Sequence, residues 1–214
     1  MGRKESKIQR WTSRSLGIIF FVLVSQNLIS SPIDHHQERF EDVALKIWEY
    51  AELGYLEEKS SSLLQQELKD SGFTIQSRVA GIPTAFVAEY NNGGPVIGIL
   101  GEFDALPGLS QQNLPFKTAE GLSSANGHAC GHHLFGAASA WAAVAIKEWL
   151  EESRTPGTIR FYGTPAEEGG SGKVYIARDG YFDDVDIVLH WHPASGNSAD
   201  AQSSNSNKSG KFTF

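Results

Sequence analysis

The sequence predicts an α/β domain in which strands and helices alternate along the chain. Short apolar segments rich in β-branched and aromatic residues occur at residues 84–90, 96–100, 158–164 and 186–191, and each is typical of a strand. Helical periodicity lies before and between these segments. The helix expected at residues 134–150 is rich in alanine, which favours close packing of a helix against a sheet.

The remaining segments fit the same pattern. Apolar residues recur at helical spacing through residues 37–71, with a break at Gly54. Gly72 follows, as a glycine often does just beyond a helix C-terminus. Residues 91–94, Asn-Asn-Gly-Gly, predict a turn between the first two strands. Residues 110–127 are polar and have no clear period, and a long loop of this kind in a compact domain is often functional.

The composition indicates a globular protein with one ordinary domain and the start of a second. The chain has 214 residues, of which 40% are hydrophobic and 20% are charged. Its formal net charge is -7, and no cluster of Lys and Arg follows the N-terminal segment, so we expect no nucleic-acid partner. A single cysteine excludes an internal disulfide.

The N-terminal segment has the order of regions typical of a secretory signal peptide. Basic residues precede an apolar run at residues 16–24, and a polar stretch follows at residues 25–31. The apolar run is shorter than the roughly 20 residues that a membrane-spanning helix needs. We therefore expect residues 1–31 to be a signal peptide and the mature protein to be exported, either periplasmic or extracellular. An uncleaved N-terminal anchor is the alternative.

Side chains that bind metal ions gather between residues 130 and 192. They are one thiol, two imidazoles and two adjacent carboxylates: Cys130, His132, Glu167, Glu168 and His192. Zinc accepts all three ligand types. Each group follows a strand or lies in a loop, where an α/β sheet presents its ligands. Neighbouring carboxylates on an extended segment point in different directions, so one could bind a metal while the other acts as general base.

Taken one at a time, these residues permit simpler interpretations. A lone cysteine is usually a small buried hydrophobic residue, and a pair of glutamates is usually a solvated surface feature. We expect His190 to pack within its strand, and His128 and His133 to have structural or supporting roles. Spacing alone leaves a metal site and these alternatives equally open.

The segments resemble a family of zinc-dependent amidohydrolases and metallopeptidases related to aminoacylase, carboxypeptidase G and the plant auxin-conjugate hydrolases. The likeness rests on His-Ala-Cys-Gly-His at residues 128–132, Pro-Ala-Glu-Glu at 165–168, the segment 101–108 that contains Asp-Ala-Leu-Pro, and a weaker match at 51–54. It covers residues 38–214. Within the family, the likeness is greatest to the aminobenzoyl-glutamate hydrolase branch.

That branch assignment rests on two short segments. Trp191-His192-Pro193 follows the later strand, as in that branch. Cys130-Gly131-His132 is followed by His133-Leu134, where members of the branch have Asn-Leu. His133 therefore changes the hydrogen bonding expected beside the metal ligands.

The resemblance implies a three-layer α/β catalytic domain of the zinc-exopeptidase type at residues 38–194, and a linker with the start of a second, α+β dimerisation domain at 195–214. It implies one base and four metal ligands: Glu167 as general base, with Cys130, His132, Glu168 and His192 as ligands. The cofactor would be a divalent metal, zinc or manganese, with two ions in the complete protein. The implied reaction is hydrolysis of an amide bond in a small N-acyl amino acid or aminobenzoyl-glutamate-like substrate by metal-activated water.

The family also uses a ligand histidine far toward the C-terminus, and no residue after His192 supplies it. We therefore expect an N-terminal fragment that is inactive by itself. At full length we expect a homodimer or hetero-oligomer that binds a small-molecule amide. The alternative function is a truncated, non-catalytic metal-binding remnant.

Overall fold

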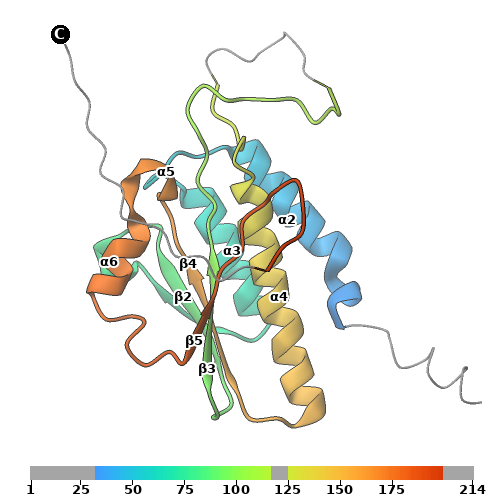
Figure 1. Cartoon of the computed structure of the whole chain (residues 1–214), viewed down its shortest axis with the longest axis vertical. Coiled ribbons are helices and arrows are strands. Elements are labelled where there is room, and N and C mark those ends of the chain that lie inside the picture. Colours follow the sequence, from blue (N-terminus) through green and yellow to red (C-terminus); the bar gives the residue numbers. More distant parts are fainter. Residues whose placement is uncertain (1–31, 117–124, 200–214) are drawn as a thin grey trace, which may run out of the picture.

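The computed structural model describes residues 32–116 and 125–199, which form a mixed five-stranded sheet between layers of helices (Figure 1). The strands are β1 (Thr74–Ser77), β2 (Phe86–Asn91), β3 (Val96–Gly101), β4 (Thr158–Gly163) and β5 (Ile187–Leu189). Their order in the sheet is β1-β2-β4-β3-β5. The β1–β2 and β2–β4 pairs are antiparallel, whereas β3 pairs in parallel with both β4 and β5.

Helices cover both faces of this sheet (Figure 1). They are η1 (Pro32–His36), α2 (Gln37–Tyr50), α3 (Glu58–Asp70), η2 (Val79–Gly81), α4 (His132–Ser153), α5 (Glu167–Gly170) and α6 (Gly172–Arg178). One face carries α2, α3 and α4, and the other carries α6 and η2. Within the described residues, no helix is long and apolar enough to cross a membrane.

The alternation of side chains along β4 separates two cores. Ile159 and Phe161 are buried against α2, α3 and α4, whereas Tyr162 faces the other way and packs with Leu100 and Ile176. Each fully buried side chain of this size stabilises the fold by about 1.5–3 kcal/mol. The two cores hold the sheet rigidly, so that the residues following its strands have fixed positions.

The small residues of α4 bring its first turns close to the end of β3. A Cβ atom at Gly136 would lie 2.8 Å from the main-chain oxygen of Glu102, so only glycine fits there without a shift. Ala137 and Ala140 are also buried on this helix. The expected packing of an alanine-rich helix against a sheet is therefore observed.

The predicted α/β class is correct, and two local features differ from expectation. β1 was not predicted, because its four residues are short, mostly exposed and lie at the edge of the sheet. The turn at residues 91–94 does not close a hairpin, because β4 lies between β2 and β3. The expected signal peptide at 1–31, and the part of the expected second domain at 200–214, lie outside the described residues.

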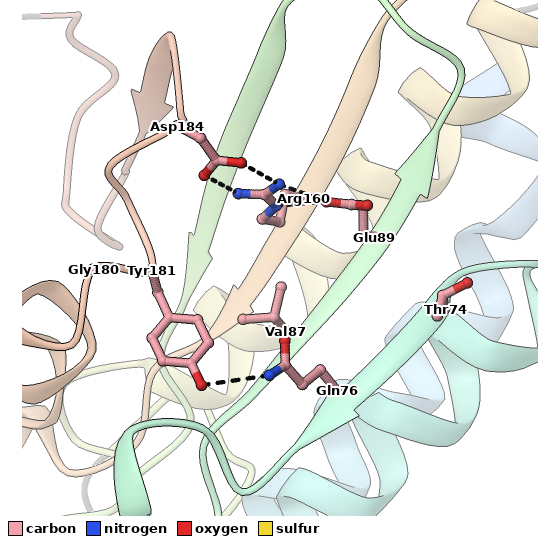
Figure 2. Close-up of a pocket in the computed structure, with 8 residues that line it drawn as sticks. All are labelled: Thr74, Gln76, Val87, Glu89, Arg160, Gly180, Tyr181 and Asp184. Atoms are coloured by element: carbon pink, nitrogen blue, oxygen red, sulfur yellow. Dashed lines mark hydrogen bonds and ion pairs between the residues drawn. The ribbon is translucent and has the colours of Figure 1, made fainter.

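The face of the sheet opposite α4 has an ion-pair cluster centred on Arg160 (Figure 2). The Arg160 guanidinium donates to both carboxylate oxygens of Asp184, at 2.7 and 3.0 Å, and its Nε donates to Glu89 at 2.8 Å. Tyr162 accepts a further contact from Arg160 at 3.3 Å. Arg160, Asp184 and Glu89 line a pocket together with Tyr181. The guanidinium thus has oxygen partners on β2, on β4 and on the loop that follows α6.

Candidate metal centre

Side chains capable of binding metal gather where β3, β4 and β5 end. These three strands are parallel, so their carboxyl ends meet at one edge of the sheet, where open α/β sheets bind ligands. Figure 1 shows α5 and the first turn of α4 at this same end. The residues brought together are those following β3 (Glu102, Asp104), those of α5 (Glu167, Glu168), those after β5 (His190, His192), and Cys130 with His132 at the start of α4.

His132 lies at the centre of this group and is completely buried. Its Nδ1 donates to Asp104 Oδ1 at 2.9 Å, and its Nε2 lies 3.0 Å from Glu102 Oε2. Burial opposes a charged ring, but the carboxylates of Asp104 and Glu102 outweigh it and raise the pKa of His132 to about 10. The metal-free ring therefore carries a proton that a cation bound at Nε2 would displace.

Glu102 is a buried carboxylate, 2% exposed, to which the sequence pattern assigned no role. Its Oε1 contacts Lys173 Nζ and lies 3.4 Å from His190 Nε2. Burial opposes ionisation, but contacts with His132, His190 and Lys173 hold the pKa of Glu102 well below its usual range. Glu102 is therefore ionised at neutral pH.

Asp104 links His132 to the pair of glutamates. Its Oδ1 accepts from His132, and its Oδ2 accepts from the backbone N–H of Glu168 at 2.8 Å. A carboxylate on the far side of a histidine fixes the ring and directs the other ring nitrogen at the metal. The sequence pattern did not identify Asp104 and Glu102 as site residues, although both lie just beyond a buried strand, within the segment 101–108.

The two predicted glutamates lie in the short helical turn α5, so the extended segment expected for them is wrong. Ala166, before them, has a left-handed backbone (φ 58°), and its N–H donates to Glu57 Oε1 at 2.8 Å. A Cβ at Gly54 would lie 3.0 Å from Ala166, so this close approach favours glycine at position 54. Gly54 belongs to the segment 51–54 that resembles the family.

Burial distinguishes the two glutamates from each other. The Glu168 side chain is 18% exposed, and its Oε1 lies 3.9 Å from His132 Nε2. The Glu167 side chain is 43% exposed, and its Oε2 lies 4.0 Å from the same nitrogen. The more exposed Glu167 can be reached by water and substrate. Glu168 directs a buried oxygen at His132.

Cys130 and His192 form the other side of the group. Cys130 Sγ lies 3.3 Å from His192 Nε2, and the rings of His132 and His192 are 5.6 Å apart. Burial, together with Glu168 nearby, raises the pKa of Cys130 to about 11. The thiolate needed for metal binding therefore forms only if a cation supplies opposite charge.

The other histidines differ in position. His190 does not pack within β5, contrary to expectation, because β5 ends at Leu189 and the His190 ring reaches Glu102 instead. His128 donates to the main-chain oxygen of Ile47 at 3.0 Å, and burial lowers its pKa to about 4. Burial likewise lowers the pKa of His133 to about 4.

Among the described residues, two groups of potential ligand atoms each lie within 4.8 Å of one another, and both include His132. One is Cys130, His132 and His192; the other is Glu102, His132 and Glu167. Glu102 Oε2, His132 Nε2 and Glu168 Oε1 are buried without a hydrogen-bond partner, and the 3.0 Å contact between the first two lacks hydrogen-bond geometry. Buried polar atoms are rarely left unpaired, and a divalent cation beside His132 would supply a partner for such atoms. The residues therefore fit a metal ion.

The sequence matches the family peptidase M20/M25/M40 over residues 98–204. It is 47% identical over 165 residues to a subunit of the p-aminobenzoyl-glutamate hydrolase of Escherichia coli (strain K12), covering 77% of this chain and 34% of that protein. It is 32% identical over 180 residues to the Xaa-Arg dipeptidase of Mus musculus, covering 78% of this chain and 38% of that protein. The chain thus spans well under half the length of these curated relatives.

Solved structures of known proteins share the fold. The YXEP protein of Bacillus subtilis, a dinuclear metal binding peptidase from the M20 family, aligns with a TM-score of 0.61 and 27% identity over 72% of this chain and 42% of that one. The aminobenzoyl-glutamate utilization protein of Klebsiella pneumoniae aligns with a TM-score of 0.51 and 17% identity over 73% of this chain and 43% of that one. With the family match over half of its residues, this chain belongs to the M20/M25/M40 peptidase family.

Proposed function

We propose that the protein hydrolyses an amide bond in a small N-acyl amino acid or aminobenzoyl-glutamate-like substrate with the help of a divalent metal. The observation that supports this most strongly is the convergence of three unpartnered buried atoms at the carboxyl ends of parallel strands: Glu102 Oε2, His132 Nε2 and Glu168 Oε1. The solved YXEP relative, a dinuclear metal binding peptidase, supports two ions in the complete protein.

Four residues would hold the metal: Cys130, His132, Glu168 and His192. Thiolate and imidazole ligands favour zinc, whereas added carboxylates favour manganese. When bound, the metal supplies Lewis acidity, which polarises an amide carbonyl and acidifies water. The protein's own part is to fix the His132 ring through Asp104 Oδ1.

Glu167 would act as general base. Its half-exposed carboxylate lies beside the buried ligand atoms. Its Oε2 is 4.0 Å from His132 Nε2, and Glu168 Oε1 is 3.9 Å from the same nitrogen, which is about the separation of two ligand atoms on one metal ion. A Glu167 oxygen would accept the proton of the attacking water and then give it to the leaving amine. The backbone of Ala166, held by Glu57, positions this carboxylate.

Substrate, partners and location are inferred on separate grounds. The 47% identity to a p-aminobenzoyl-glutamate hydrolase chain supports an N-acylated glutamate-like amide as the substrate. Because that relative is one subunit of its enzyme, we infer that the complete protein is oligomeric. The basic-then-apolar order of residues 1–31 supports export.

The test uses the longest polypeptide that contains this chain, supplied with zinc or manganese. Hydrolysis of p-aminobenzoyl-glutamate and a panel of N-acyl amino acids is measured for the parent, for Glu167→Gln and for Glu168→Gln. A general base contributes about 10²–10⁴-fold, so Glu167→Gln should lose that factor in kcat and keep its metal. Glu168→Gln should also lose metal. Parental turnover by Glu167→Gln would refute the base, and bound metal without turnover in the parent would favour a non-catalytic metal-binding protein.

A further inference from the structure

Glu102 has a buried carboxylate oxygen, Oε2, that has no hydrogen-bond partner within the described residues. We propose that Glu102 is a direct ligand of the metal, through Oε2, in a position shared with His132. This inference rests on the proposed function and deepens it, because it adds a ligand outside the set formed by Cys130, His132, Glu168 and His192.

The two oxygens of Glu102 have different surroundings. Oε1 contacts Lys173 Nζ and lies 3.4 Å from His190 Nε2, so it is anchored by groups that carry or can carry positive charge. Oε2 lies 3.0 Å from His132 Nε2 without a hydrogen bond. Carboxylates that bind metals are commonly hydrogen-bonded to other protein groups, which orient them. Glu102 has this arrangement, with one oxygen held and the other directed at a candidate ligand.

The spacing of the atoms fits a single ion. Metal bonds to nitrogen and carboxylate oxygen of about 2.0–2.2 Å place two ligand atoms of one ion about 3 to 4.4 Å apart. From His132 Nε2, the distances are 3.0 Å to Glu102 Oε2 and 3.9 Å to Glu168 Oε1. Each of these oxygens therefore lies at a distance from His132 Nε2 that is expected for two ligands of one cation. In the described residues, Glu102, His132 and Glu167 offer ligand atoms that all lie within 4.8 Å of one another.

A purely structural ion pair explains the site less well. Glu102 is 2% exposed and His132 is completely buried, so water does not readily satisfy atoms left unpaired there. A structural pair would place a hydrogen bond between Nε2 and Oε2, but the atoms approach without one. Both atoms are therefore available to a bound cation.

The carboxylate position also bears on metal choice. His132 Nε2 has one lone pair and binds one ion at a time, whereas His132 belongs to both groups of candidate ligands in the described residues. An ion held by Glu102 and His132 has a carboxylate ligand beside the imidazole and no thiolate, which suits manganese. Cys130 and His192, with Sγ and Nε2 3.3 Å apart, remain as soft ligands for zinc.

The experiment measures metal binding by the 214-residue chain. Mn²⁺ affinity is read from the electron paramagnetic resonance signal of the free ion, and the visible spectrum of the Co²⁺-loaded chain reports the ligand set. The variants are Glu102→Gln, Glu102→Asp and Lys173→Met. The matched control is Glu89→Gln, a glutamate paired with Arg160 on the other face of the sheet.

Glu102→Gln should weaken Mn²⁺ binding at least tenfold, since even loss of a supporting partner costs about 10–100-fold, and should change the Co²⁺ spectrum. Lys173→Met should weaken binding less and keep the spectrum, and Glu89→Gln should match the parent. Parental affinity and spectrum in Glu102→Gln would overturn the ligand role while leaving the proposed function intact. If Glu102→Gln does not fold, an unchanged spectrum in Glu102→Asp overturns the role. A parent chain that binds neither ion would overturn both proposals.

Discussion

The Arg160 cluster and the metal centre are both groups of charges on the same sheet, but only the first is complete by itself. The Arg160 guanidinium pairs with Asp184 and Glu89, and the Asp184 hydrogen bonds raise the pKa of Arg160 (Figure 2). Around His132, four carboxylates gather: Glu102, Asp104, Glu167 and Glu168. The structural cluster matches its donors with acceptors, whereas the centre has an excess of negative charge and unpartnered buried atoms.

Position in the sheet explains this difference. Arg160 lies inside β4 and pairs across to β2 and to the loop after α6, so its partners come from regular register and packing. The centre lies beyond the ends of β3, β4 and β5, where three connections converge. Charge within a strand therefore serves the fold here, whereas charge collected at strand ends leaves room for a ligand.

His132→Ala should have the largest effect on metal binding and stability, and should distinguish the metal centre most clearly from the Arg160 cluster. It removes the imidazole between Asp104 and Glu102, and breaking a buried ion pair costs about 3–5 kcal/mol. We expect metal binding to be lost and the metal-free unfolding free energy to fall by that amount, measured by urea denaturation at pH 7. Arg160→Ala should leave metal affinity unchanged, and a loss of metal there would show that the two regions are not independent.

The pH dependence of stability should also differ between the regions. The pKa of His132 is raised to about 10 in the fold, so its contribution is complete below about pH 6.5 and is lost as pH rises toward 10. Metal affinity should change in the opposite direction and rise with pH, because the ion displaces the ring proton. Urea denaturation in a chelator from pH 6 to 10 checks the first statement, with His132→Gln as the control. The same slope in both proteins would show that another group is responsible.

Cys130→Ala should weaken zinc binding more than manganese binding, because a thiolate is a soft ligand. The Cys130 Sγ atom lies 3.3 Å from His192 Nε2, so the thiol and this imidazole can bind the same ion. Competitive titration of the purified chain with each metal measures the ratio of affinities. Equal affinities in variant and parent would remove Cys130 from the ligand set.

Asp184→Asn should have the smallest effect, because the Asp184 side chain is 67% exposed. Exposed ion pairs contribute about 0–1 kcal/mol and weaken with added salt. Urea denaturation at low and high salt should show a small difference at low salt that disappears at high salt. A loss comparable with that of His132→Ala would contradict the assignment of the Arg160 cluster as a minor structural feature.

The sequence by itself determined the α/β class, most of the elements and the family, because apolar periodicity and short motifs are local properties of the chain. It also indicated Cys130, His132, Glu168 and His192 as candidate metal ligands, and the structure brings them to one edge of the sheet. Their roles as ligands, and that of Glu167 as base, stay predictions.

Only the tertiary structure decided which carboxylates face His132. Many acidic residues follow strands, so nothing in the local sequence distinguishes Glu102 and Asp104 from the others. They become site residues because β3 lies in parallel between β4 and β5. Likewise, His190 contacts Glu102 because β5 ends one residue earlier, and the glutamates turn into α5 because Glu57 and Gly54 hold Ala166. Strand order and long-range contacts set these neighbours, and such contacts join residues that are far apart in the sequence.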